Sequence, residues 1–125
     1  MLHEDYLVRQ IDVMVKYLAE TVFKNKKKTY NITAEKYFEI NGAGKNVLYL
    51  YDLADQGEIN LAENILYDKI DEERSLELFE VGVDFYVYLN SKDDDFLESN
   101  DFSRQEIYDG LEDLQKIYGL LWYTT

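Results

Sequence analysis

The sequence contains one spacing of apolar and small residues twice. A large apolar residue is followed three positions later by a small residue and four positions after that by leucine, in Ile59, Ala62 and Leu66 and again in Ile107, Gly110 and Leu114. Residues three and four apart lie on one face of an α-helix. A small residue between two large ones lets a neighbouring helix approach closely. The spacing therefore predicts an all-α fold of packed helices, and it indicates packing, not catalysis.

The length and apolar content of the chain fit a single domain over residues 1–125. Hydrophobic residues make up 46% of the sequence, which is enough for a core at this size. There is no cysteine, so disulfides and thiolate sites are excluded. The N-terminus carries acids where a signal peptide needs bases, and apolar runs fall far short of the ~20 residues of a membrane span. We expect a cytoplasmic protein.

Charge is distributed unevenly along the chain. The net charge is −13, from 13 basic and 26 acidic residues. Residues 1–45 hold eight bases and six acids, or +2, whereas residues 46–125 hold five bases and 20 acids, or −15. The acidic excess argues against nucleic acid or an anionic membrane as the partner. The asymmetry favours docking of the basic part on the acidic part, within one chain or between two.

Apolar periodicity predicts a series of amphipathic helices. Residues 1–28 form an N-terminal helix with a basic end, 29–45 a loop, 46–118 two helical pairs, and 119–125 an apolar tail. The expected helices run from His3 to Lys24, Asn46 to Asp55, Ile59 to Ile70, Glu73 to Leu89 and Ser103 to Tyr118, with a turn of helix around Phe96 and Leu97 in an acidic connection.

Local signals mark several of the expected helix ends. Ser103 and Glu106 form a capping box, in which each side chain can satisfy a backbone donor near the other residue. Gly57 ends the helix expected from Asn46 to Asp55. Gly119 suits the left-handed position after the last helix. Because proline is absent, glycine is the only strong punctuation.

The two helical pairs resemble tetratricopeptide repeats. Gly57, Glu58 and Ile59, followed by Ala62 and Leu66, look like the second-helix half of that repeat. A second set of residues resembles the first-helix half of the repeat: Leu78, Val81, Gly82 and Phe85. The first pair departs from the pattern because the stretch from Asn46 to Leu53 lacks the small residue, and residues 90–102 enlarge the second turn. The resemblance implies a helical bundle or short right-handed superhelix.

The whole chain also resembles a family of small uncharacterised proteins of Gram-positive bacteria. Three stretches carry the resemblance: Glu4 to Ile11, Ala54 to Asn64 and Phe102 to Ile107. That family has no assigned activity. The resemblance therefore supports the helical fold and supplies no catalytic residue.

Histidine chemistry and phosphate binding find little support in the sequence. His3 is the only histidine, which excludes Ser–His catalysis and histidine-based metal sites. The stretch from Gly42 to Lys45 is similar to the end of a phosphate-binding loop. Glu39 stands where its first glycine belongs, and Asn46 stands where serine or threonine belongs. We expect an ordinary loop here and no cofactor.

An acidic run offers the other candidate for chemistry. Asp93, Asp94 and Asp95, with Glu98 and Asp101, gather oxygen ligands that suit a hard cation such as calcium. The turn glycine and the terminal glutamate of an EF-hand are missing. A solvated acidic loop is the favoured interpretation, so we predict no metal site and no catalytic residues.

The twelve tyrosines are the remaining functional signal. Tyr51, Tyr88 and Tyr108 lie off the inferred repeat face, and Trp122 lies in the apolar tail. We therefore predict these four as interaction residues. The favoured function is a non-catalytic module for binding a protein or peptide, with a groove that is acidic at the rim, aromatic within, and suited to a basic or amphipathic segment.

Two other classes of function stay open. The broad apolar face from Leu7 to Val22, together with the Trp122 tail, could form the interface of a structural or regulatory homo-oligomer, in the simplest case a homodimer. The least favoured hypothesis is that the chain is a cation-binding protein or an enzyme.

Overall fold

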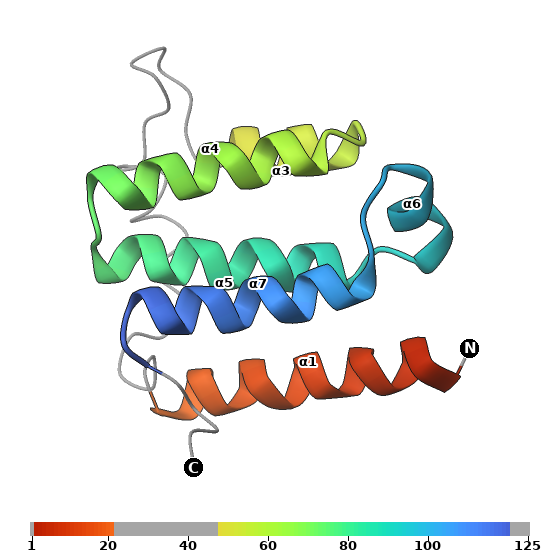
Figure 1. The fold of residues 1–125 in the computed structure, drawn as a ribbon, viewed down its shortest axis with the longest axis horizontal. Coiled ribbons are helices and arrows are strands. Elements are labelled where there is room, and N and C mark those ends of the chain that lie inside the picture. The colour runs from red at the N-terminus through yellow and green to blue at the C-terminus, as the bar shows by residue number, and fades with distance from the viewer. Residues whose placement is uncertain (1, 22–47, 121–125) are drawn as a thin grey trace.

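The computed structural model describes residues 2–21 and 48–120, and these are entirely helical apart from turns (Figure 1). The helices of these two stretches are α1 (Leu2–Thr21), α3 (Leu48–Asp55), α4 (Ile59–Glu72), α5 (Leu76–Asn90), α6 (Asp94–Ser99) and α7 (Arg104–Ile117). The predicted all-α class is confirmed. None of these helices is long and apolar enough to cross a membrane.

The helices pack around a central antiparallel pair, α5 and α7 (Figure 1). α1 lies against both helices of this pair, on the side away from α3 and α4. α3 and α4 form a tight hairpin, and both contact α5. α5 therefore contacts four other helices, which explains why its aromatic residues Phe79, Phe85 and Tyr86 are fully buried.

The predicted apolar stripe of the first helix faces this core. Leu7, Ile11, Met14 and Leu18 of α1 are buried. The stripe is thus covered within a single chain, and a subunit contact through α1 would have to use its outer face. Val22, the last residue of the predicted stripe, lies outside the described residues, as do Lys24 to Lys28, the loop 29–45 with Gly42 to Lys45, and Trp122.

The helix ends follow their local sequence signals. One half of the predicted capping box is present, because the Ser103 hydroxyl accepts a hydrogen bond from the Glu106 backbone N–H at 3.2 Å. In place of the other half, the Glu106 carboxylate accepts from the Ser103 hydroxyl, also at 3.2 Å. Gly57 and Gly119 adopt positive φ angles of 88° and 70°, as their positions predict. α5 begins later than expected, at Leu76, because the Ser75 hydroxyl accepts from the Leu78 N–H at 3.2 Å and caps the helix there.

The two glycines of the central pair each accommodate a large side chain from the facing helix. A Cβ at Gly82 would lie 2.8 Å from a methyl carbon of Leu114, and a Cβ at Gly110 would lie 2.5 Å from the Tyr86 hydroxyl oxygen. Tyr86 follows Gly82 by four residues, and Leu114 follows Gly110 by four. The contacts are therefore reciprocal, and the small residue at position 110 accommodates an aromatic ring, not a helix backbone.

Candidate functional site

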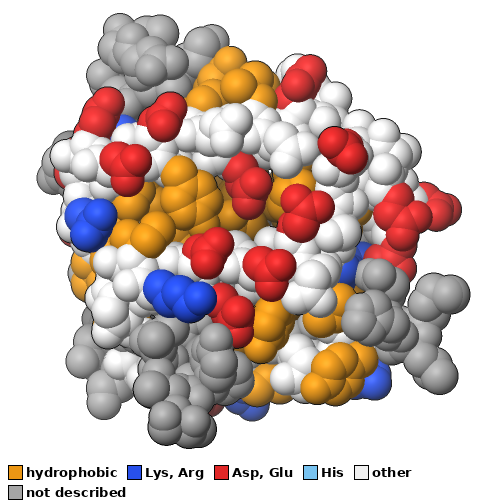
Figure 2. Space-filling model, in the orientation of Figure 1, with side chains coloured by type: hydrophobic (Ala, Val, Ile, Leu, Met, Phe, Trp, Pro, Cys, Tyr) orange, Lys and Arg blue, Asp and Glu red, His pale blue; other side chains and the backbone are white. Residues whose placement is uncertain are grey.

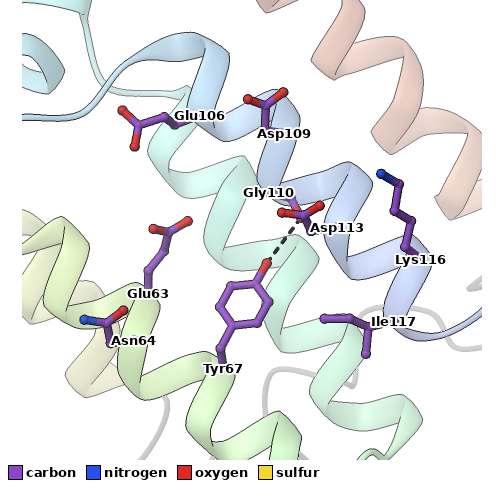
Figure 3. Close-up of a pocket in the computed structure, with 9 residues that line it drawn as sticks. All are labelled: Glu63, Asn64, Tyr67, Glu106, Asp109, Gly110, Asp113, Lys116 and Ile117. Atoms are coloured by element: carbon purple, nitrogen blue, oxygen red, sulfur yellow. Dashed lines mark hydrogen bonds between the residues drawn. The ribbon is translucent and has the colours of Figure 1, made fainter.

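A groove of about 540 Å³ lies between α4 and α7 (Figure 3). Acidic side chains surround it, and Figure 2 shows hydrophobic side chains on its floor between them. Helix α4 and helix α7 form the two walls. The lining residues are Glu63, Asn64 and Tyr67 of α4 and Glu106, Asp109, Gly110, Asp113, Lys116 and Ile117 of α7.

A chain of hydrogen-bonded phenol groups begins at Tyr67, which lines the groove, and continues to the fully buried Tyr86. The Tyr67 hydroxyl donates to the Gly110 carbonyl oxygen at 3.3 Å and lies 3.3 Å from the Tyr86 hydroxyl. Tyr86 donates to the Glu63 carboxylate at 2.5 Å. Burial raises the pKa of Tyr67 to about 12 and raises that of Tyr86 as well. Both phenols therefore stay protonated at neutral pH and hold α4, α5 and α7 together.

The electrostatics of the groove disfavour negative charge. Burial raises the pKa of Glu63 above its ordinary value, and the carboxylates of Glu106 and Asp113 raise it further. The hydrogen bond from Tyr86 opposes these effects. Since several carboxylates face one another across a partly apolar surface, a cation entering the groove would relieve their repulsion.

Replacing Glu63 with glutamine should stabilise the protein at neutral pH. Glutamine keeps an acceptor for the Tyr86 hydroxyl, and it removes the ionisable carboxyl group, whose pKa is raised in the folded state. A raised folded pKa means that ionisation above it costs stability, while below the unfolded-state pKa of about 4.5 the carboxyl is neutral in both states. We expect a gain of up to about 1 kcal/mol at pH 7 that disappears below about pH 4.5.

Urea unfolding of the wild type and of Glu63→Gln across pH 3.5–8 measures this difference. Asp52→Asn is the matched control, because Asp52 is exposed on α3 and outside the groove. A Glu63→Gln gain that persists undiminished at low pH would contradict the assignment of the effect to ionisation.

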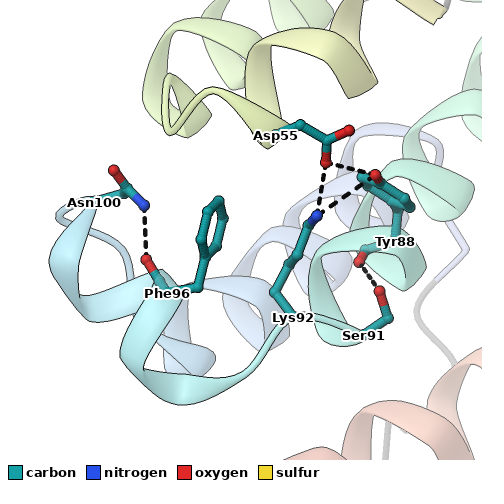
Figure 4. Close-up of polar contacts among 6 residues, drawn as sticks. All are labelled: Asp55, Tyr88, Ser91, Lys92, Phe96 and Asn100. Carbon is teal, nitrogen blue, oxygen red and sulfur yellow. Dashed lines mark hydrogen bonds and ion pairs between the residues drawn. The ribbon is translucent and has the colours of Figure 1, made fainter.

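Tyr51 and Tyr88 lie together at a second place, away from the groove. Their rings meet edge to face with centroids 4.7 Å apart. The Tyr88 hydroxyl donates to Asp55 at 2.5 Å, and Lys92 Nζ donates to the same carboxylate oxygen at 2.6 Å (Figure 4). The Lys92 ammonium also lies 4.7 Å from the centre of the Tyr88 ring. These contacts join the end of α3 to the end of α5.

Tyr108, the third predicted tyrosine, lies on the α1 side of α7. Burial raises its pKa, as do Glu112 and the nearby Tyr6. None of the three predicted tyrosines lines the groove. Tyr67 and the four acids of the groove are not among the residues predicted from the sequence, although Glu106, Asp109 and Asp113 are regularly spaced along one helix.

The acidic run at residues 93–95 does not converge on one point. Asp93 Oδ1 accepts from the Phe96 N–H at 2.8 Å and caps α6, while Asp94 pairs with Arg104 at 2.5 Å. Asp95 is exposed. Among the described residues no three His, Cys, Asp or Glu side chains are grouped so that they could hold a metal ion. Two of the three aspartates thus have structural roles.

The fold and the groove define a helical domain with an acidic, aromatic-floored surface channel. The chain belongs to DUF6483, a family of unknown function, and the match covers residues 1–119. No curated protein and no solved structure matched the chain.

Proposed function

We propose that this protein is a non-catalytic interaction module that binds a basic or amphipathic protein segment in the groove between α4 and α7. The observation that carries the proposal is the placement of four carboxylates, from Glu63, Glu106, Asp109 and Asp113, around a floor that contains Tyr67 and Ile117. Acidic walls favour lysine and arginine, and the floor favours their apolar stems or a neighbouring apolar side chain.

Charge and apolar contact would have separate roles in such binding. An exposed ion pair contributes only about 0.2–1 kcal/mol, so the carboxylates would mainly steer and orient the partner. A cation above the Tyr67 ring would add about 0.5–2 kcal/mol, more as water is excluded. Affinity should therefore fall with added salt without disappearing.

Neutralising two groove acids should weaken this binding about tenfold. The probe is a fluorescently labelled, helix-forming peptide with lysines on one face and leucines on the other, titrated with the full chain and followed by anisotropy. The test variant is Asp109→Asn with Asp113→Asn. The control is Asp52→Asn with Glu98→Gln, which removes the same charge from exposed positions on α3 and α6.

The two double variants separate a site from a general charge effect. Loss of affinity confined to the groove variant supports the proposal. Equal losses in both variants, or no binding of the peptide to the wild type, would rule out the groove as the binding site.

The remaining helices and aromatic residues would support the same interaction. The pairs α3 with α4 and α5 with α7 would be two imperfect tetratricopeptide-like pairs, completed by α1. Tyr51, Tyr88 and Tyr108 would be further interaction residues outside the groove, and Trp122 is proposed as a fourth. The protein would act in the cytoplasm of a Gram-positive bacterium.

A homodimer through α1 is the second candidate. It is favoured by the outer face of that helix, where Tyr6 is 55% and Val13 50% exposed. Ile11 is fully buried and could not contribute to the interface. Light scattering of the wild type decides the matter, because a monomeric mass at high concentration excludes this function.

A further inference from the structure

The charged residues that α7 contributes to the groove form an ordered row. Glu106, Asp109, Asp113 and Lys116 follow one another at intervals of three, four and three residues, which keeps them on one helix face. All four are exposed and line the groove (Figure 3). From Glu106 to Lys116 the row contains three negative charges followed by one positive charge, over about 15 Å of helix axis. We call these four residues the α7 charge row.

Local contacts hold part of the row in place without neutralising it. The Glu106 carboxylate accepts from the Ser103 hydroxyl, and the Asp109 carboxylate accepts from the Gln105 amide at 3.0 Å. Each donor is a neutral side chain, so neither contact is an ion pair. The row therefore presents a fixed sequence of charges to any segment that lies along the groove.

We infer that the groove binds an α-helix of a partner protein running antiparallel to α7, with an acidic side chain opposite Lys116 and cations opposite Asp113, Asp109 and Glu106. This inference rests on the proposed function and specifies its partner. The partner helix carries an acid and then basic residues three, seven and ten positions later, all on one face.

The spacing of the row favours a helix over an extended peptide. The intervals of the row correspond to about 4.5, 6 and 4.5 Å along the axis. A second helix presents side chains at the same intervals when its contact residues are also three and four apart. A β-strand places side chains on one face every ~6.6–6.8 Å and loses register over four contacts.

The order of charges favours the antiparallel direction. In that direction the partner has its acid in an early turn and its bases in later turns. Acids near the N-terminus and bases near the C-terminus both stabilise a helix through its dipole. A parallel partner with complementary charges would carry them in the unfavourable order. The antiparallel partner is therefore complementary to α7 and also stable as a helix.

The α4 wall of the groove supplies further contacts for the partner cation that lies opposite Asp113. Tyr67 reaches from α4 to the Gly110 carbonyl, so its ring lies between the levels of Asp109 and Asp113. Glu63 lies on the same wall as Tyr67, and its charge interacts with those of both Glu106 and Asp113. A lysine or arginine opposite Asp113 would thus lie between two carboxylates and beside an aromatic ring.

Two synthetic helical peptides of identical composition test this register. The matched peptide carries glutamate at its first contact position and lysines three, seven and ten residues later. The permuted peptide exchanges that glutamate with the lysine seven residues on, which places glutamate opposite Asp109 and lysine opposite Lys116. Anisotropy titrations with the full wild-type chain at low salt should show the matched peptide binding at least tenfold more tightly.

A charge reversal in the protein provides the reciprocal measurement. Asp109→Lys should weaken the matched peptide and strengthen the permuted one, so that the difference between them narrows or inverts. Leu61→Ala is the control because Leu61 is exposed on α4 and outside the groove lining, and it should leave the preference unchanged.

The outcomes separate this inference from the proposed function. Equal affinity for both peptides, lost in the Asp109→Asn and Asp113→Asn double variant, overturns the register and leaves the groove as a binding site. Failure of both peptides to bind overturns the inference and the proposed function together. Retention of the matched preference in Asp109→Lys also overturns the register.

Discussion

Replacing Gly110 with alanine should destabilise the protein by about 2 kcal/mol, although alanine is the better helix former. The new Cβ would lie 2.5 Å from the Tyr86 hydroxyl oxygen and 2.6 Å from ring carbon Cε1. Tyr86 is fully buried and its hydroxyl is held by Glu63, so its ring has no free space to enter. The gain of up to ~1 kcal/mol in helix propensity only partly offsets this overlap. Thermal unfolding should show a fall of roughly 6–12 °C.

The paired substitution Gly82→Ala supplies the control for this prediction. It makes the same chemical change with the same propensity gain, but its nearest neighbour is a methyl group at the end of the Leu114 side chain. That end can rotate, so we expect a much smaller loss. Tyr86→Leu removes the overlapping ring atoms, and its cost should therefore be less than additive with that of Gly110→Ala. Full additivity would show that the ring does not account for the loss.

Much of the fold could be predicted because each helix carries its own periodicity and caps. Local patterns depend on residues that are close together in the sequence, so they can be recognised without the structure. Examples are the apolar stripe containing Leu7 and Ile11, the cap at Ser103 and the left-handed residue Gly119. The start of α5 was misplaced by three residues because Glu73 is as good a helix former as its successors, and only the cap at Ser75 decides the boundary. Nothing local predicts the positive φ of 61° at Asp101, a position that usually takes glycine.

The groove could not be predicted in the same way. Glu63 and Asp113 are 50 residues apart, and either would be an ordinary exposed acid on an isolated helix. They face each other only because α4 and α7 both pack near α5, which is a property of the tertiary arrangement. The predicted tyrosines were chosen for lying off the repeat face. The structure instead places Tyr67 in the groove, because Gly110 exposes a carbonyl that its hydroxyl can reach.

Removing the Arg104 side chain should cost about 3 kcal/mol, the largest single loss that we predict. Arg104 is only 5% exposed at the start of α7. It donates from Nη1 to the carbonyl oxygen of Asn90 at 2.9 Å and from Nη2 to that of Lys92 at 3.0 Å. It also pairs with Asp94 at 2.5 Å. Arg104→Ala would leave these acceptors without their donor at the end of α5, where carbonyls already lack helical partners.

Two further variants separate the contribution of the Asp94 ion pair to stability from that of the hydrogen bonds to the two carbonyl groups. Asp94→Asn keeps an acceptor at a side chain that is 37% exposed, so we expect a loss of about 1 kcal/mol or less. Arg104→Lys keeps the charge but cannot reach two carbonyls and a carboxylate at once, so it should recover less than half of the loss. Urea unfolding measures all three variants, with an unchanged m value as the sign of intact two-state behaviour. If Asp94→Asn were as destabilising as Arg104→Ala, the ion pair would account for the loss and the carbonyl contacts would not. If Arg104→Lys were fully stable, positive charge alone would be sufficient to join α7 to the end of α5.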